Sequence, residues 1–294
     1  MNRLPVAATL LAGGLLCLST TAQAREFLGF SQPGFPGSLA WQLYPTFQPT
    51  SGGTNSAYAF AELAYYSKTG FTGTTRDQFE YWVGADIGYA DTKGAAGSSG
   101  WGTAFPELGI EYYYNVLQPT TPRGSADFRS FWVSPTFYVN FPNGNTQSSG
   151  YGAGDDQYSM NFNVNTFNQW GPVILTFDTV EFNYSFKNLN STPAPGTLNG
   201  FTKATGGLSL TFADLAVGYQ LTPDIAIGVL HQFDYNNVAG SSFRHTSEGI
   251  IGPTFTYAGF AKIGLFFAGA VETDYYRENM NHNTYITGWI TKTF

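Results

Sequence analysis

Residues that could carry enzyme chemistry are few in this sequence and form no recognisable set. The chain has three histidines and one cysteine among 294 residues. His245 lies near Ser241 and Ser242, but no Ser-His-acid constellation can be read from the sequence. No metalloprotease, paired-cysteine or phosphate-binding glycine motif occurs, and the adjacent acids Asp155 and Asp156 are a weak signal for a cation. We therefore predict no catalytic residue, no metal and no cofactor.

Carboxylates are the more informative chemical groups. The chain carries 20 acidic and 13 basic residues, for a formal net charge of −7. Many of them stand in segments where apolar residues alternate with polar or aromatic ones, and they keep to the polar face. The charged residues predicted on that face are Glu80, Asp86, Glu107, Glu111, Asp178 or Glu181, Asp214, Asp234, Glu248, Lys262, Glu272 and Asp274. Three large aromatic residues share it, namely Trp82, Trp132 and Tyr138.

Two interpretations of this polar face remain open. If it lines a permeation path, the acidic groups disfavour anions and the aromatic rings offer surfaces to flat apolar solutes. Alternatively, the same side chains fill and cross-link a narrow barrel without selecting a solute. Counter-ions such as Ca²⁺ could also neutralise the acidic excess.

The last twelve residues, Asn283–Phe294, show the strand pattern on which this interpretation rests. One face of this segment holds Ile286, Gly288, Ile290 and Phe294, and the other holds Tyr285, Thr287, Trp289, Thr291 and Thr293. A period of two residues is typical of a strand with two different surroundings. A final strand that ends on an aromatic residue is typical of outer-membrane barrels, so Phe294 is predicted to be an assembly signal for the barrel assembly machinery.

Twelve such segments can be traced along the chain, although ten or fourteen remain possible. They cover residues 39–47, 57–66, 78–90, 105–116, 128–141, 158–164, 173–186, 208–220, 225–236, 249–257, 261–276 and 283–294. The alternation slips by one residue near Asp178 and again near Asp214, which predicts two β-bulges forming one feature. From the C-terminus backwards, long and short connections alternate, with a tight turn at Tyr257–Phe260. The predicted fold is an all-β transmembrane antiparallel barrel.

Composition agrees with a membrane barrel. Aromatic residues make up 17% of the chain and charged residues 11%, against about 25% charged residues in ordinary globular domains. The net negative charge and the absence of a basic stripe argue against nucleic-acid binding. A secreted β-sandwich or β-helix is the main alternative fold.

The N-terminus predicts export. Residues 1–24 resemble a signal peptide, with Arg3, a short apolar run and the cleavage motif Ala22-Gln23-Ala24. Residues 25–38 are predicted to form a periplasmic lead, and residues 39–294 the barrel. Cys17 is the only cysteine, so the mature chain would contain no disulfide. We expect the protein in the outer membrane of a Gram-negative bacterium, with outer-membrane lipid as a partner.

The second half of the chain resembles a known family, the outer-membrane porins named for the meta-cleavage pathway of phenol degradation. The stretches that carry the resemblance are Ser134-Pro135 with Phe141–Gly144, Gly206–Asp224, Ile225–Tyr235, and Ile251–Tyr257 with the Phe294 end. The chain departs from the family pattern at Asn143, where Thr is commoner, and at residues 102–108, which lack a Gly-Asp pair. The resemblance implies an outer-membrane channel that imports aromatic or other hydrophobic compounds, and it supplies no binding residues.

The resulting hypothesis is passive uptake of small solutes, with aromatic or hydrophobic compounds among them. A general cation-preferring porin, a structural barrel and an outer-membrane hydrolase are the alternatives. The identity of the small-molecule solute, the open state of the pore and the oligomeric state do not follow from the sequence.

The C-terminal pattern leads to a test. Deletion of Phe294 should impair barrel assembly, whereas Lys292→Tyr should be tolerated because a rim position accepts either an aromatic ring or a snorkelling lysine. The yield of heat-modifiable barrel in outer-membrane fractions measures both variants. A normal yield from the deletion would contradict the proposed assembly role of Phe294.

Overall fold

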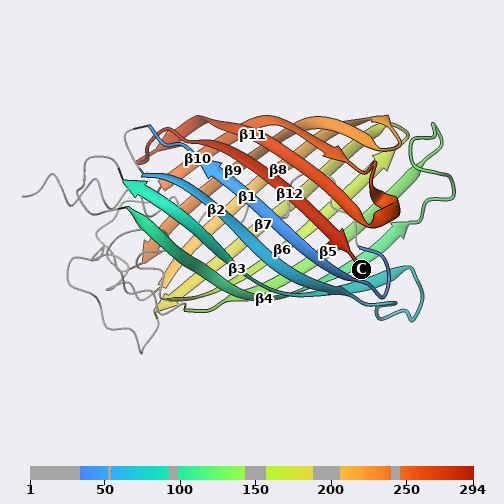
Figure 1. The fold of residues 1–294 in the computed structure, drawn as a ribbon, viewed down its shortest axis with the longest axis horizontal. Coiled ribbons are helices and arrows are strands. Elements are labelled where there is room, and N and C mark those ends of the chain that lie inside the picture. The colour runs from blue at the N-terminus through green and yellow to red at the C-terminus, as the bar shows by residue number, and fades with distance from the viewer. Residues whose placement is uncertain (1–33, 52–53, 93–98, 143–156, 188–205, 240–245) are drawn as a thin grey trace, which may run out of the picture.

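The computed structural model describes residues 34–51, 54–92, 99–142, 157–187, 206–239 and 246–294. The side chains at 54, 92, 105, 157, 178–187, 206–213 and 236–239 are not part of the description. Twelve antiparallel strands form one closed barrel in which every strand pairs with its neighbours in the chain and β1 pairs with β12 (Figure 1). The strands are β1 (Leu39–Gln48), β2 (Thr54–Tyr66), β3 (Asp77–Thr92), β4 (Gly100–Leu117), β5 (Arg129–Asn140), β6 (Gln157–Trp170), β7 (Val173–Lys187), β8 (Gly206–Thr222), β9 (Ile225–Ala239), β10 (Thr246–Tyr257), β11 (Leu265–Glu278) and β12 (Thr284–Thr293). The predicted fold and strand number are confirmed.

The ring closes through the C-terminal strand. Ala40 of β1 stands opposite Thr293 of β12, and Phe47 stands opposite Ile286. The amide of Phe294 donates to the carbonyl of Leu39 at 2.8 Å, so the pairing runs to the last residue. Closure gives the backbone groups of the edge strands partners, which a bilayer requires because it offers no water to replace them.

The two faces of each strand differ as the alternation predicts. On β3, Glu80 and Trp82 are buried inside the barrel. Their sequence neighbours Tyr81 and Val83 are 43% and 56% exposed. The outward face carries large apolar side chains on all twelve strands, among them Trp41, Leu63, Leu108, Phe137, Phe162, Leu175, Val217, Ile227, Phe255, Val271 and Ile286. The apolar outer face fits lipid, and the polar inner face forms a lumen.

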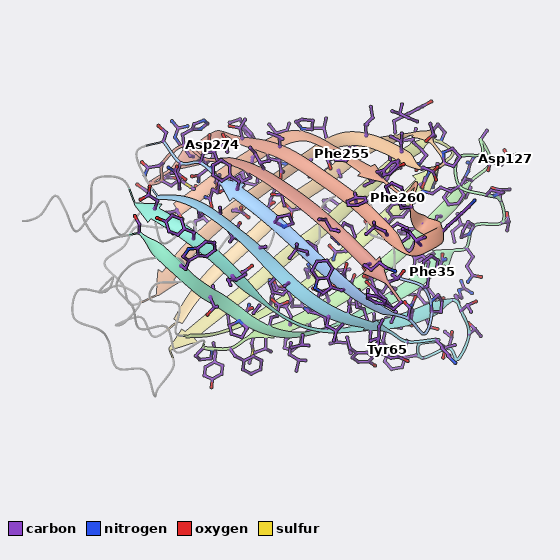
Figure 2. The ribbon with its side chains drawn as sticks, in the orientation of Figure 1. Phe35, Tyr65, Asp127, Phe255, Phe260 and Asp274 are labelled. Carbon is purple, nitrogen blue, oxygen red and sulfur yellow. The ribbon has the colours of Figure 1, made fainter. Side chains whose placement is uncertain are left out.

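Charged groups on outward-facing positions of the described strands, exposed or half-buried, lie at strand ends. These residues are Asp91, Arg129, Arg277, Glu278 and Lys292. Figure 2 shows the two ends with Asp274 at one and Asp127 at the other. Among the described residues, no helix is long and apolar enough to cross a membrane.

The connections distinguish the two ends of the barrel. One end, here called the periplasmic rim, holds the start of β1, the end of β12 and the connections at 67–76, 118–128, 171–172, 223–224 and 258–264. The other, the external rim, holds the connections at 49–53, 93–99, 141–156, 188–205, 240–245 and 279–283. The shortest turns lie on the first set and the longest loops on the second, which assigns the two sides by the usual rule for such barrels.

Three sequence predictions about connections and strand lengths were wrong. The segment after Tyr257 does not turn at once into a strand: a short 3₁₀ helix, η2 (Ala261–Ile263), intervenes, and β11 starts at Leu265. The connection at 279–283 is therefore shorter than the one at 258–264, and the strict long–short alternation fails there. The sixth strand extends to Trp170 rather than ending near residue 164.

The two predicted bulges are present and compensate one another. One extra residue separates Asp178 and Phe182 relative to β6, and another separates Phe212 and Leu215 relative to β9. Between β7 and β8 the register does not shift, and Asp178 stands directly opposite Asp214. The two bulges therefore form one feature.

The outward face yields a stability prediction. Val83→Arg, near the middle of β3, should lower the free energy of unfolding by about 2–4 kcal/mol because a guanidinium enters the lipid core. Asp91→Arg, at the end of the same strand, is the matched control and should cost about 0–1 kcal/mol. Urea unfolding in lipid vesicles measures both. Equal stabilities would mean that Val83 does not face lipid.

Candidate functional site

The lumen is the candidate site, and the structure places the predicted residues in it with one exception. All nine carboxylates are buried on the inner face, as are Trp82 and Tyr138, while Trp132 is half-buried there; the carboxylates are Glu80, Asp86, Glu107, Glu111, Asp214, Asp234, Glu248, Glu272 and Asp274. Lys262 is the exception. It lies exposed in η2 at the periplasmic rim, because the strand predicted to carry it begins three residues later.

Some predicted features lie outside the described residues. These are the signal peptide at 1–24, most of the lead at 25–38, Asp155, Asp156 and His245. The side chains of Asp178 and Glu181 also lie outside the described set.

Gln42 joins the acidic residues of β2 and β3. Its Nε2 atom donates to Glu62 Oε1 at 2.6 Å and to Glu80 Oε1 at 3.1 Å. Its Oε1 atom accepts from Trp289 Nε1 and from Thr291 Oγ1, both at 3.0 Å. One neutral amide thus connects two carboxylates to the C-terminal strand.

Sequence analysis missed Glu62 and Gln42. Both occupy the inward phase of their strands. Gln42 lies between the buried residues Ala40 and Tyr44 of β1, and Glu62 lies between the buried residues Phe60 and Ala64 of β2. The alternation on the first two strands therefore contained the signal. Glu62 and Gln42 were overlooked because most inward-facing residues on these two strands are uncharged.

Neutral donors also hold the carboxylates of β3 and β4. The Tyr113 hydroxyl lies 2.7 Å from Glu80 Oε2 and 2.9 Å from Glu111 Oε2, so its single proton is shared between the two carboxylates. Trp82 Nε1 donates to Glu107 Oε1 at 2.6 Å. The indole lies against Gly109, where an added methyl group would overlap the ring, so a glycine is needed there.

A second acidic group lies towards the external rim on β9 to β12. Glu248 accepts from Asn283 Nδ2 at 3.1 Å and from the Tyr285 hydroxyl at 2.8 Å. Asp234 accepts from Gln232 Nε2 at 3.0 Å. Here too, amides and a phenol donate to the carboxylates.

In the part of the chain that the structure describes, Asp274 is the member of this second acidic group that contacts basic side chains. Arg277 lies 3.4 Å from one carboxylate oxygen of Asp274, and His282 Nδ1 contacts the other. Both partners are partly exposed at the rim, so this cluster marks the mouth of the lumen.

Acidic residues stand directly opposite one another across neighbouring strands. Glu80 of β3 pairs in register with Glu111 of β4, and Glu248 of β10 pairs with Asp234 of β9. Like charges at such positions destabilise a sheet. The lumen therefore brings together acidic groups that destabilise the sheet when both members of a pair are ionised.

The wall formed by β5 and β6 differs from the acidic walls. Its buried inward residues are uncharged, namely Ser130, Ser134, Thr136, Tyr138, Asn140, Ser159, Asn161, Asn163, Asn165, Phe167 and Gln169. The negative charge of the lumen is therefore carried by the strands on either side of this wall.

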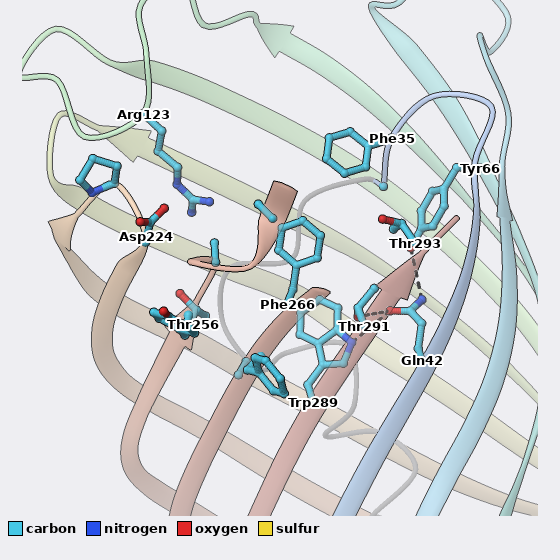
Figure 3. A pocket seen from close by; sticks show the side chains of 17 residues that line it. Phe35, Gln42, Tyr66, Arg123, Asp224, Thr256, Phe266, Trp289, Thr291 and Thr293 are labelled. Carbon is cyan, nitrogen blue, oxygen red and sulfur yellow. Dashed lines mark hydrogen bonds between the residues drawn. The ribbon is translucent and has the colours of Figure 1, made fainter. Parts of the chain in front are cut away.

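A cavity of about 370 Å³ opens at the periplasmic rim. Figure 3 shows Arg123 and Asp224 on one side of it and Phe35, Tyr66 and Gln42 on the other. Phe266 and Trp289 lie between them. Arg123 comes from the β4–β5 connection, which has no periodic pattern, and nothing in the sequence indicated that it would reach the lumen.

The described residues do not assemble a catalytic set. His282 contacts Asp274, but no hydrogen bond in the described part of the chain joins it to a serine hydroxyl. His231 shares a 2.7 Å hydrogen bond with Tyr275. Within the same residues, no group of three or more His, Cys, Asp and Glu side chains is arranged for a metal ion.

Comparison with solved structures agrees with this architecture. An outer-membrane channel from Pseudomonas putida F1 is 13% identical, with a TM-score of 0.63 over 90% of this chain and 97% of that chain. The translocator domain of the autotransporter NalP from Neisseria meningitidis is 10% identical, with a TM-score of 0.54 over 98% and 99% of the two chains. At these identities the likeness shows the fold, which is that of an outer-membrane β-barrel.

The comparisons do not show a family. No family model matches the sequence, and no curated protein matches it. Outer membrane phospholipase A from Escherichia coli is 10% identical and covers 98% of both chains, but its TM-score of 0.40 is too low to carry an argument about activity.

The Trp82–Glu107 contact gives a matched test. Trp82→Phe removes the donor to a buried carboxylate and should lower the free energy of unfolding by about 1.5–3 kcal/mol. Trp132→Phe removes an indole with no hydrogen bond in the described part of the lumen and should cost less. Urea titrations of the folded barrel compare the two variants, and equal losses would show that the hydrogen bond contributes nothing beyond ring size.

Proposed function

We propose that the protein is an outer-membrane channel for the passive uptake of small solutes, with a preference for cations over anions. The observation that carries the proposal is the pairing of carboxylates in register, Glu80 with Glu111 and Glu248 with Asp234, inside a closed barrel. The barrel topology supplies a lumen that joins the two sides of the membrane, and the acidic pairs give that lumen a negative potential.

The acidic pairs favour a permeation role over a purely structural one. A filled barrel is stabilised by neutral or oppositely charged cross-strand pairs, whereas like charges work against it. Rings of acidic side chains are a common means by which channels select cations. A passing cation offsets the repulsion between the carboxylates, so the destabilising arrangement has a use in transport.

Aromatic side chains extend the range of solutes. Tyr44 and Trp289 stack with ring centroids 5.9 Å apart at 9°, and Tyr113 meets Trp132 edge-on at 6.4 Å. Aromatic faces attract organic cations and flat apolar molecules. Aromatic or hydrophobic compounds therefore remain part of the proposed solute range, in line with the resemblance to the phenol meta-pathway porins.

A hydrolase is the second candidate function, and the His282–Asp274 contact favours it because histidine and aspartate form two members of a hydrolytic triad. Esterase and phospholipase assays on the purified barrel, with His282→Ala and His245→Ala, test it. Activity lost in either variant would support the enzyme over the channel.

Planar-bilayer recordings under a salt gradient test the channel directly. The wild-type protein should give conductance steps, and the sign of its reversal potential should be that of a cation-selective pore. Glu80→Gln combined with Glu248→Gln should move the reversal potential towards that of a non-selective pore, because each change removes one charge from an acidic pair. Glu278→Gln, an exposed residue at the end of β11, is the matched control and should leave selectivity unchanged.

Two outcomes would contradict the proposal. A barrel that shows no steps is not a channel. Unchanged selectivity in the Glu80 and Glu248 double variant would mean that these carboxylates only hold the lumen together.

A further inference from the structure

The cavity at the periplasmic rim differs chemically from the lumen above it. Its walls are largely aromatic, with Phe35, Tyr66, Phe266 and Trp289 around one space (Figure 3). Phe35, from the segment that precedes β1, lies 6.2 Å from Phe266 between ring centroids. A planar ring can therefore meet aromatic faces on more than one side.

Arg123 supplies the positive charge of this cavity. Its Nε atom donates to Gln220 Oε1 at 3.0 Å. The Gln220 amide is itself fixed, because its Nε2 atom donates to the carbonyls of Thr222 at 2.7 Å and Ile225 at 3.2 Å. The guanidinium is thus positioned through one nitrogen, and in the described part of the chain its two terminal nitrogens donate to no other group.

The charge of Arg123 is poorly compensated by the protein. Burial lowers the pKa of Arg123, because removal from water penalises its charged form. Asp224 is the acidic residue in the cavity wall, but it is exposed to solvent and forms no ion pair with Arg123. A half-buried guanidinium with a free planar edge matches the two oxygens of a carboxylate.

We propose that the periplasmic-rim cavity is a binding site for a small aromatic carboxylate, whose carboxylate pairs with Arg123 and whose ring packs between Phe266 and Trp289. The ligand approaches from the periplasmic side, since the acidic pairs of the lumen repel an anion from the external side. When bound, it lies across the mouth of the barrel and obstructs it.

The indole of Trp289 is held in place for this contact. Its Nε1 atom donates to Gln42 Oε1 at 3.0 Å, and its ring stacks on Tyr44. Gln42 in turn is bonded to Glu62 and Glu80. The aromatic wall is therefore rigid and coupled to the acidic residues of the lumen.

Isothermal titration of benzoate into the detergent-solubilised, full-length barrel tests the binding site. Benzoate should bind saturably. The neutral isostere benzamide should bind at least about tenfold more weakly, because the loss of one charged hydrogen-bonding contact is worth roughly that factor. The aliphatic anion acetate should also bind more weakly, because it lacks the ring that packs between Phe266 and Trp289. Arg123→Gln should weaken benzoate binding by about the same factor. Arg277→Gln, at the external rim, is the matched control and should bind benzoate as the wild type does.

Each alternative result overturns the proposal. Benzamide binding as tightly as benzoate would exclude a carboxylate site, and this comparison needs no variant to fold. Equal benzoate affinity in Arg123→Gln and the wild type would exclude Arg123 as the partner. Absence of saturable binding would exclude the site altogether.

Bilayer recordings separate this proposal from the channel proposal. Benzoate should reduce the conductance of a channel when added on the periplasmic side and have little effect from the external side. A barrel without conductance that still binds benzoate through Arg123 would refute the channel and keep the site. A conducting barrel that does not bind benzoate would do the reverse.

Discussion

The structure depends on one constraint, which is that lipid cannot replace a missing backbone hydrogen bond. The seam between β1 and β12 meets that constraint by leaving no open sheet edge, and its hydrogen bonds continue to Phe294. Closure divides the side chains of every strand into an outer set that meets lipid and an inner set that meets the lumen. The apolar outer band and the polar inner face both follow from this division, and so does the gathering of the carboxylates in a single internal space.

That internal space is organised by neutral donors more than by basic ones. Gln42, Tyr113 and Trp82 donate to carboxylates on β2 to β4, and Asn283, Tyr285 and Gln232 do so near the external rim. Amides, phenols and indoles orient a carboxylate without cancelling its charge. These neutral contacts hold the carboxylates in place, and Arg123 is a positive group at the opposite mouth from Asp274.

The sequence predicts the barrel well because a strand between lipid and water has a simple period. Alternation located all twelve strands, the paired bulges and the inward carboxylates other than Glu62. The alternation placed Lys262 wrongly. The residues around Lys262 alternate between polar and apolar types as in a strand, but they form the short helix η2. Arg123 could not be found, since its position results from a loop that folds over the rim and from its bond to Gln220, which is distant in sequence. The spacing of residues along the chain does not predict a contact of this kind.

The unshifted pairing of β7 with β8 couples the lengths of these two strands. Each carries one residue more than its outer neighbour requires, and the two additions lie opposite each other. Loss of one residue from β7 alone would restore its register with β6. Beyond that point, however, inward-facing residues of β7 would stand beside outward-facing residues of β8. Only a simultaneous loss from both strands leaves a uniform barrel. Insertions and deletions in this part of the chain are therefore expected to be inherited in pairs among related sequences, although the two positions are separated by a long stretch of chain.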